Sequence, residues 1–174
     1  MHFDAAQINQ AAWAFSQAEK AAARYYRMSE ARLKDLRYDV KTLAYLVKHE
    51  INERAFAQLC RYDYTPERRD DKGAVFSFYR VCLQDNRILD AVNRTAVFVK
   101  LPPLLLYIAT HELVHVIRFD AGEGSFEASW EEKVREEQRV HSITRDMLAP
   151  LFYPGLKLIL DCFGDYPQVG DLLN

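Results

Sequence analysis

Cysteine, glycine and proline are scarce in this chain. Its 174 residues include three cysteines, six glycines and six prolines, and we find neither internal repeats nor low-complexity segments. The cysteines, at positions 60, 82 and 162, are odd in number and form no CxxC pair. Neither a disulfide framework nor a structural zinc knuckle is therefore predicted, and reduced thiols favour a cytoplasmic location.

The chain also lacks an excess of charge of one sign and a long apolar run. Lys and Arg number 23 against 25 for Asp and Glu, a net charge of -2. Because nucleic-acid-binding domains usually carry a basic excess, no nucleic-acid partner is expected. The most apolar stretch, 96–117, is interrupted by lysine, proline, histidine and glutamate, and the N-terminus lacks a signal-peptide pattern. No membrane partner is expected either.

Apolar residues make up 49% of the chain, enough for a single domain that spans its whole length. A capping-box pattern at Asp4 predicts a helix that extends to about Tyr26. A second apolar stripe at helical spacing predicts another helix, from Ser29 to about Leu59. Residues 1–60 are therefore expected to form a helical N-terminal part.

Strand-forming residues follow a polar segment at 61–73, which is predicted to be a loop. Aromatic and β-branched residues at 74–83 predict a first strand. A turn at 84–87 would lead into a second strand at 88–92, and 96–100 is a third short candidate. The expected sheet is small and mainly antiparallel.

Two more helices are predicted in the C-terminal half. Proline is tolerated in the first helical turn, so Pro102 or Pro103 can begin a helix that extends to about Asp120. A second capping-box pattern at Ser129 predicts a helix through about Leu148.

The HELVH sequence, His111 to His115, lies in the first of these helices. Residues four apart share a helical face, so the imidazoles of His111 and His115 can bind one zinc ion. Glu112 is offset by one position and can act as general base toward a water that the metal activates. A surface helix with two chance histidines is the alternative. The aliphatic neighbours indicate a buried helix instead, in which imidazoles need partners.

A catalytic zinc site usually has a third protein ligand. The next helix offers Glu136, Glu137 and His141. Glu137 and His141 share one helical face, whereas Glu136 shares another with apolar residues. Periodicity alone therefore does not choose between the two glutamates, and His141 is an alternative ligand.

HELVH followed by a glutamate on a second helix resembles the gluzincin clan of zinc metallopeptidases, and the plan of the chain is similar to single-domain minigluzincins. The resemblance covers about 96–150. It implies that Glu137 is the third ligand, since it follows His115 by 22 positions (137 − 115 = 22). His141 stands where the clan mostly has Asp or Asn, so it would orient the ligands or replace the third one. Tyr153 is implied as a possible oxyanion stabiliser, because gluzincins often use a residue beyond the ligand helix.

The resemblance implies a zincin-like α+β fold, with 74–150 as catalytic core and 151–174 as C-terminal tail. It implies Zn2+-dependent hydrolysis of peptide bonds in a peptide or protein substrate, with Glu112 as general base. The strand at 96–100 would bind the extended substrate. A catalytically silent zincin-scaffold protein with a regulatory or binding role is the alternative. In a latent variant, the helices of residues 1–60 would cover the cleft.

Overall fold

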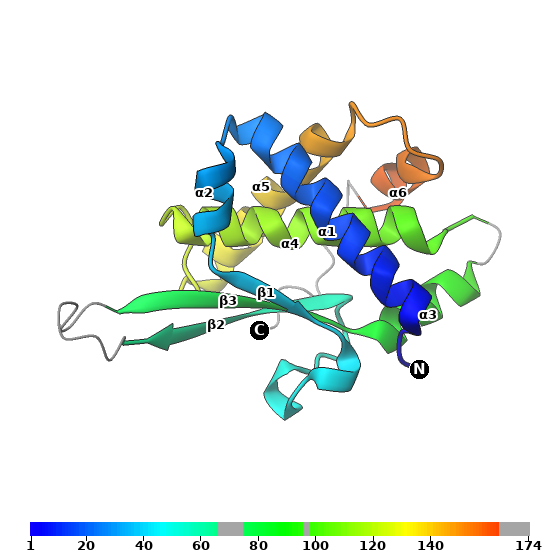
Figure 1. Cartoon of the computed structure of the whole chain (residues 1–174), viewed down its shortest axis with the longest axis horizontal. Coiled ribbons are helices and arrows are strands. Elements are labelled where there is room, and N and C mark those ends of the chain that lie inside the picture. Colours follow the sequence, from blue (N-terminus) through cyan, green and yellow to red (C-terminus); the bar gives the residue numbers. More distant parts are fainter. Residues whose placement is uncertain (66–74, 96–97, 164–174) are drawn as a thin grey trace.

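The computed structural model describes residues 1–65, 75–95 and 98–163. Helix α4 runs through the middle of the molecule, with α1 crossing it on one side and the sheet below (Figure 1). In chain order the elements are α1 (Ala5–Tyr26), α2 (Glu30–Asp35), β1 (Tyr38–Lys41), the short 3-10 helices η1 (Leu43–Tyr45) and η2 (Lys48–Glu50), β2 (Ala57–Tyr64), β3 (Phe76–Leu83), α3 (Asp85–Arg94), α4 (Leu101–Asp120), α5 (Trp130–Leu148) and α6 (Leu156–Phe163).

The central helix α4 is buried along almost its whole length. Every residue from Pro103 to Arg118 is buried. Helix α1 packs against it through small side chains, among them Ala14, Ala18 and Ala22, which are completely buried. Because short side chains at the contact allow two helix axes to approach closely, α1 covers one side of α4 tightly. The polar residues of α4 must therefore find partners inside the protein.

The three strands form one sheet in the order β1-β3-β2. Strand β1 is parallel to β3, and β2 is antiparallel to it, so the sheet is mixed. The longer pairing, between β2 and β3, is antiparallel. Alternation along β3 places Val81 and Leu83 in the core, while Arg80 lies on the other face. Among the described strands, β2 lies at an edge of the sheet.

The helix predicted to extend to Leu59 is wrong, and residues 1–60 are not all helical. Helix α2 ends at Asp35, and strand β1 follows. Tyr38 and Val40 pack against the core from alternate positions of β1. Apolar residues separated by an even number of positions are compatible with a strand as well as with a helix. Here the pairing with β3 determines that the segment forms a strand.

The turn predicted at 84–87 and the strand predicted at 88–92 are also wrong, because this segment forms α3. The buried carboxylate of Asp85, at the start of α3, accepts hydrogen bonds from the N–H groups of Phe3 at 2.9 Å and Leu43 at 3.1 Å. Both partners are distant in sequence. Local strand preference gives no sign of such contacts.

The segments predicted as strands at 74–83 and 96–100 and as a loop at 61–73 differ in outcome. The strand predicted at 74–83 is confirmed as β3 over its described residues. The segment predicted as a loop at 61–73 begins instead as part of β2, which extends to Tyr64. The strand predicted at 96–100 is not formed by its described residues, 98–100. Of these segments, residues 66–74 and 96–97 lie outside the described part of the chain, and residues 65 and 75 belong to neither strand.

The helices that begin with clear start signals are confirmed. Asp4 and Gln7 form the capping box of α1, and Ser129 and Glu132 form that of α5. Helix α4 begins at Leu101 with proline in its first turn. The α+β class is confirmed as well.

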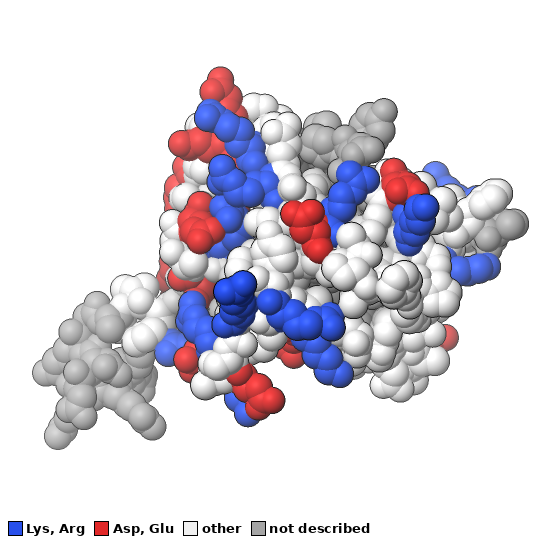
Figure 2. Space-filling view, turned by 90° about the horizontal axis from the view of Figure 1, so that it is seen from above, with Lys and Arg blue, Asp and Glu red and all other residues white. Residues whose placement is uncertain are grey.

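Basic and acidic side chains are interspersed on the face shown in Figure 2. Such mixing agrees with the net charge of -2. None of the helices in the described residues combines the length and the apolar character that crossing a membrane requires.

Candidate metal centre

His111 and His115 lie one turn apart on α4, and both are buried. Their Nε2 atoms are 3.2 Å apart, and their ring centroids are 4.8 Å apart. The separation by four residues places both imidazoles on one helical face. The two nitrogen atoms therefore converge on one point beside α4.

Glu137 reaches this point from α5. Its Oε1 lies 2.8 Å from His115 Nε2, and its Oε2 lies 3.3 Å from His111 Nε2. Burial raises the pKa of the Glu137 carboxyl, but the charge of His115 and hydrogen bonds from both imidazoles outweigh it and hold that pKa well below its usual range. The carboxylate is therefore ionised, as a metal ligand must be.

His141 lies one turn beyond Glu137 on α5. Its Nε2 is 3.9 Å from Glu137 Oε2, and its Nδ1 is 2.6 Å from the hydroxyl of Tyr107 on α4. The ligand atoms of His111, Glu137 and His141 all lie within 4.8 Å of one another. Burial, and after it the charge of His111, lowers the pKa of His141 to about 4, so its imidazole is neutral at pH 7.

This donor set fits a divalent transition-metal ion. Imidazole nitrogen and carboxylate oxygen are ligands that zinc uses, and other transition metals use them too. The buried Nε2 of His141 has no hydrogen-bond partner among the residues that the structure describes. Leaving such an atom unpaired is costly, and a cation at the centre of the cluster would supply its partner.

Glu136, the competing glutamate, has a different partner. Both of its carboxylate oxygens accept hydrogen bonds from Arg118, at 2.6 Å from Nε and 3.0 Å from Nη2. Such two-point pairing is strong and has a fixed geometry. The structure thus brings Glu137 to the histidines and commits Glu136 to Arg118.

Glu112 opens onto the same space as the cluster. A pocket of about 740 Å³ is lined by Glu112 together with His111, His115 and Glu137. Strand β2, the segment at 122–126 and helix α5 contribute further walls. Its volume falls within the range of ligand-binding pockets.

Tyr153 is not brought to the centre. It is absent from the described residues that line the pocket, and its ring packs against Trp13 of α1 at a centroid distance of 5.1 Å. The structure therefore offers no support for an oxyanion-stabilising role for Tyr153.

The predicted cover over the cleft is not formed by the N-terminal helices. Among the described lining residues, none comes from α1 or α2, although His49 and β2 contribute. Helix α1 belongs to the core against α4. The prediction that these helices keep the protein latent is not supported by their position.

Sequence reasoning missed Tyr107. It precedes His111 by four residues, the spacing that also separates His111 from His115, and its ring stacks on His111 with centroids 6.1 Å apart. Extending the four-residue rule by one turn toward the N-terminus would have identified it.

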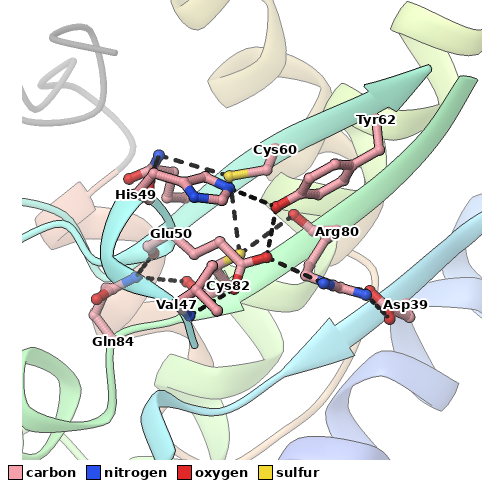
Figure 3. A network of polar contacts seen from close by, with 10 residues as sticks. Asp39, Val47, His49, Glu50, Cys60, Tyr62, Arg80, Cys82 and Gln84 are labelled. Carbon is pink, nitrogen blue, oxygen red and sulfur yellow. Dashed lines mark hydrogen bonds and ion pairs between the residues drawn. The ribbon is translucent and has the colours of Figure 1, made fainter. Parts of the chain in front are cut away.

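A polar network on the sheet holds one wall of the pocket (Figure 3). The buried Glu50 carboxylate accepts hydrogen bonds from the Tyr62 hydroxyl at 2.6 Å and from Arg80 Nη1 at 3.1 Å. Because the Tyr62 hydroxyl donates its proton to Glu50, the hydroxyl oxygen accepts a hydrogen bond from His49 Nε2 at 2.8 Å. Sequence reasoning missed this network, which joins residues from separate segments of the chain, with Tyr62 and Arg80 12 and 30 positions from Glu50.

Comparisons of the chain with protein-family models, with curated proteins and with solved structures give no significant match. No family is assigned to the chain by them, and membership of the gluzincin clan stays a prediction.

Proposed function

We propose that this chain is a gluzincin-like peptidase that hydrolyses peptide bonds with the help of a zinc ion. The observation that carries the proposal is the convergence of two imidazole Nε2 atoms, 3.2 Å apart, and the Glu137 carboxylate at an open pocket. His111, His115 and Glu137 would hold the ion. Zinc bound there would polarise the scissile carbonyl and lower the pKa of a pocket water to about 7.

Glu112 is the general base in this proposal. It neighbours His111 in sequence and lines the same pocket, while the ligand positions are filled by other side chains. Its carboxylate takes a proton from the attacking water and then transfers that proton to the nitrogen of the leaving amine. Both transfers occur at one carboxylate, so its loss should stop the reaction without removing the metal.

The edge strand β2 is the proposed binding site for the substrate backbone. It forms a wall of the pocket through residues 57–62 and has β3 as its partner on one side. An extended peptide can add to such an edge through main-chain hydrogen bonds. Strand β2 thus takes the role that the sequence suggested for 96–100.

Substitution of Glu112 tests this function. Glu112→Gln should keep the wild-type zinc content and lose at least ~100-fold in kcat on a peptide library, since general-base catalysis contributes that much or more. His115→Ala should lose zinc. Metal analysis of protein purified without chelator, paired with the peptide assay, measures both effects.

Glu131→Gln is the matched control, because that glutamate is exposed at the start of α5 with 83% of its side chain accessible. It should leave both zinc content and cleavage unchanged. An active Glu112→Gln variant would contradict the role of Glu112.

A catalytically silent metal-binding protein on the same scaffold is the second candidate. The position of His141 favours this candidate, because His141 would be a fourth ligand beside the three proposed above. Four protein ligands are typical of structural zinc sites. Stoichiometric zinc without cleavage of any member of the peptide library would support this candidate over the peptidase.

A further inference from the structure

We infer that His141 is a fourth protein ligand of the metal centre, and that Tyr107 is the positioning residue that keeps its Nε2 free to bind the ion. The inference rests on the metal site of the proposed function and not on hydrolysis. It adds a third imidazole to the two of HELVH.

The hydroxyl of Tyr107 has two partners, which together determine where its proton points. The hydroxyl oxygen lies 2.6 Å from His141 Nδ1 and 3.3 Å from the main-chain oxygen of Phe163. A carbonyl can only accept a hydrogen bond, so the hydroxyl donates to Phe163. Its oxygen then accepts the N–H of His141 Nδ1. His141 is thereby held in the tautomer whose Nε2 carries a lone pair.

The lone pair of His141 Nε2 lies close to the other ligand atoms. Nε2 of His141 lies 3.9 Å from Glu137 Oε2, and the His141 ring lies 4.6 Å from the His111 ring between centroids. A lone pair and a carboxylate oxygen are both acceptors, and 3.9 Å is too long for a hydrogen bond. Two buried acceptors this close need a donor or a cation between them, and the negative charge of the Glu137 carboxylate favours a cation.

The support behind His141 matches what metal sites use. Histidine ligands usually donate their second ring N–H to a fixed acceptor, which orients the ring and makes the ligating nitrogen more basic. The Tyr107 ring also stacks on both neighbours, at centroid distances of 6.1 Å to His111 and 6.3 Å to His141. Helix α4 therefore provides two ligands and the group that orients a ligand on α5.

His141 reaches the centre from outside the lining of the large pocket, on the side of a neighbouring smaller cavity. It is not among the described residues that line the 740 Å³ pocket, but with Tyr107 and His111 it lines a separate cavity of about 20 Å³. A fourth protein ligand on that side leaves the pocket side accessible. Water and substrate could then still reach an ion at the centre from the pocket side.

Metal affinity and a ligand-field spectrum test the inference without any activity assay. Zinc affinity is measured by competition with a chelator, and the visible absorption of the cobalt(II)-substituted protein reports the number and type of its ligands. Tyr107→Phe should weaken zinc binding ~10- to 100-fold, the usual effect of removing the partner of a histidine ligand. His141→Ala should weaken it further and alter the cobalt spectrum.

Tyr153→Phe is the matched control, since it removes a tyrosine hydroxyl from a residue that packs on Trp13 and does not line the pocket. It should keep the wild-type affinity and spectrum. Tyr107→Phe retains the ring, so it decides the question if His141→Ala fails to fold. Wild-type affinity in Tyr107→Phe, or a wild-type cobalt spectrum in His141→Ala, would overturn the inference. A protein that binds metal through His141 but cleaves no peptide would support it while contradicting the peptidase.

Discussion

Two adjacent glutamates of α5 show how one residue of helical rotation separates two roles. The carboxylate of Glu137 lies 2.8 Å from His115 Nε2, whereas that of Glu136 lies 2.6 Å from Arg118 Nε. Periodicity alone could not choose between them, because both share a helical face with apolar residues, and only the resemblance to the gluzincins favoured Glu137. The choice depends on Arg118, which lies on another helix.

Substitution at each position should therefore give different results. Glu137→Gln should lower zinc affinity strongly, because an amide is a poor replacement for a charged ligand. Glu136→Gln should leave zinc affinity unchanged but lower the free energy of unfolding by ~1–3 kcal/mol, because the Arg118 guanidinium, only 7% exposed, would lose its two-point partner and keep only the more exposed Glu123. Chelator competition and urea denaturation measure the two effects. Equal zinc affinity in both variants would show that the assignment of Glu137 is wrong.

At the scale of elements, the segment between α2 and β2 departs most from the sequence-based expectation. A helix was predicted there, and the structure has β1 and two short 3-10 helices. The Glu50 network ties this segment to the sheet, since Arg80 also pairs with Asp39 at 2.8 Å (Figure 3). Partners on three different elements decide the conformation of this segment.

Glu50 should give the protein a defined dependence of stability on pH. Burial raises the pKa of Glu50, but hydrogen bonds from Tyr62 and the Val47 N–H, with Arg80, outweigh it and lower the pKa from 4.5 to about 2. A carboxyl with a lowered pKa in the folded state stabilises fully above the unfolded pKa, and this stabilisation is lost as pH falls from 4.5 toward 2.

Glu50→Gln should therefore lower the free energy of unfolding by ~3 kcal/mol at pH 7 and flatten its decline below pH 5. Urea denaturation at several pH values measures this. Glu53→Gln, at an exposed position of the same segment, is the control and should behave as wild type. The same decline in Glu50→Gln as in wild type would rule out this source of the pH dependence.

For the whole molecule, the contact between α1 and α4 sets the position of the HELVH helix. The sequence predicted α1, yet the structure gives it a core role in place of a cover over the cleft. Its buried face includes Ala14 and Ala18, while the equally small Ala12 of the same helix is exposed. Helical spacing identifies that a helix forms, but which side is buried depends on the partner.

Enlarging a residue at this contact should destabilise the whole fold. Ala18→Leu should lower the free energy of unfolding by ~1–3 kcal/mol, because Ala18 has 0% exposure and the close helix pair has no space for a larger side chain. The same substitution at the exposed Ala12 should have little effect. Thermal unfolding followed by circular dichroism compares the two. Equal Tm values would show that the helices do not pack as described.

The sequence by itself determined α1, α4 and α5, and the placement of His111 and His115 on one helical face, because capping boxes and four-residue spacing act within a few residues. Only the tertiary structure decided which carboxylate joins them, that Tyr107 stands behind His141, and where β1 and α3 replace the expected elements. Each of these depends on a partner far away along the chain. Local patterns carry no information on such partners until the elements pack together.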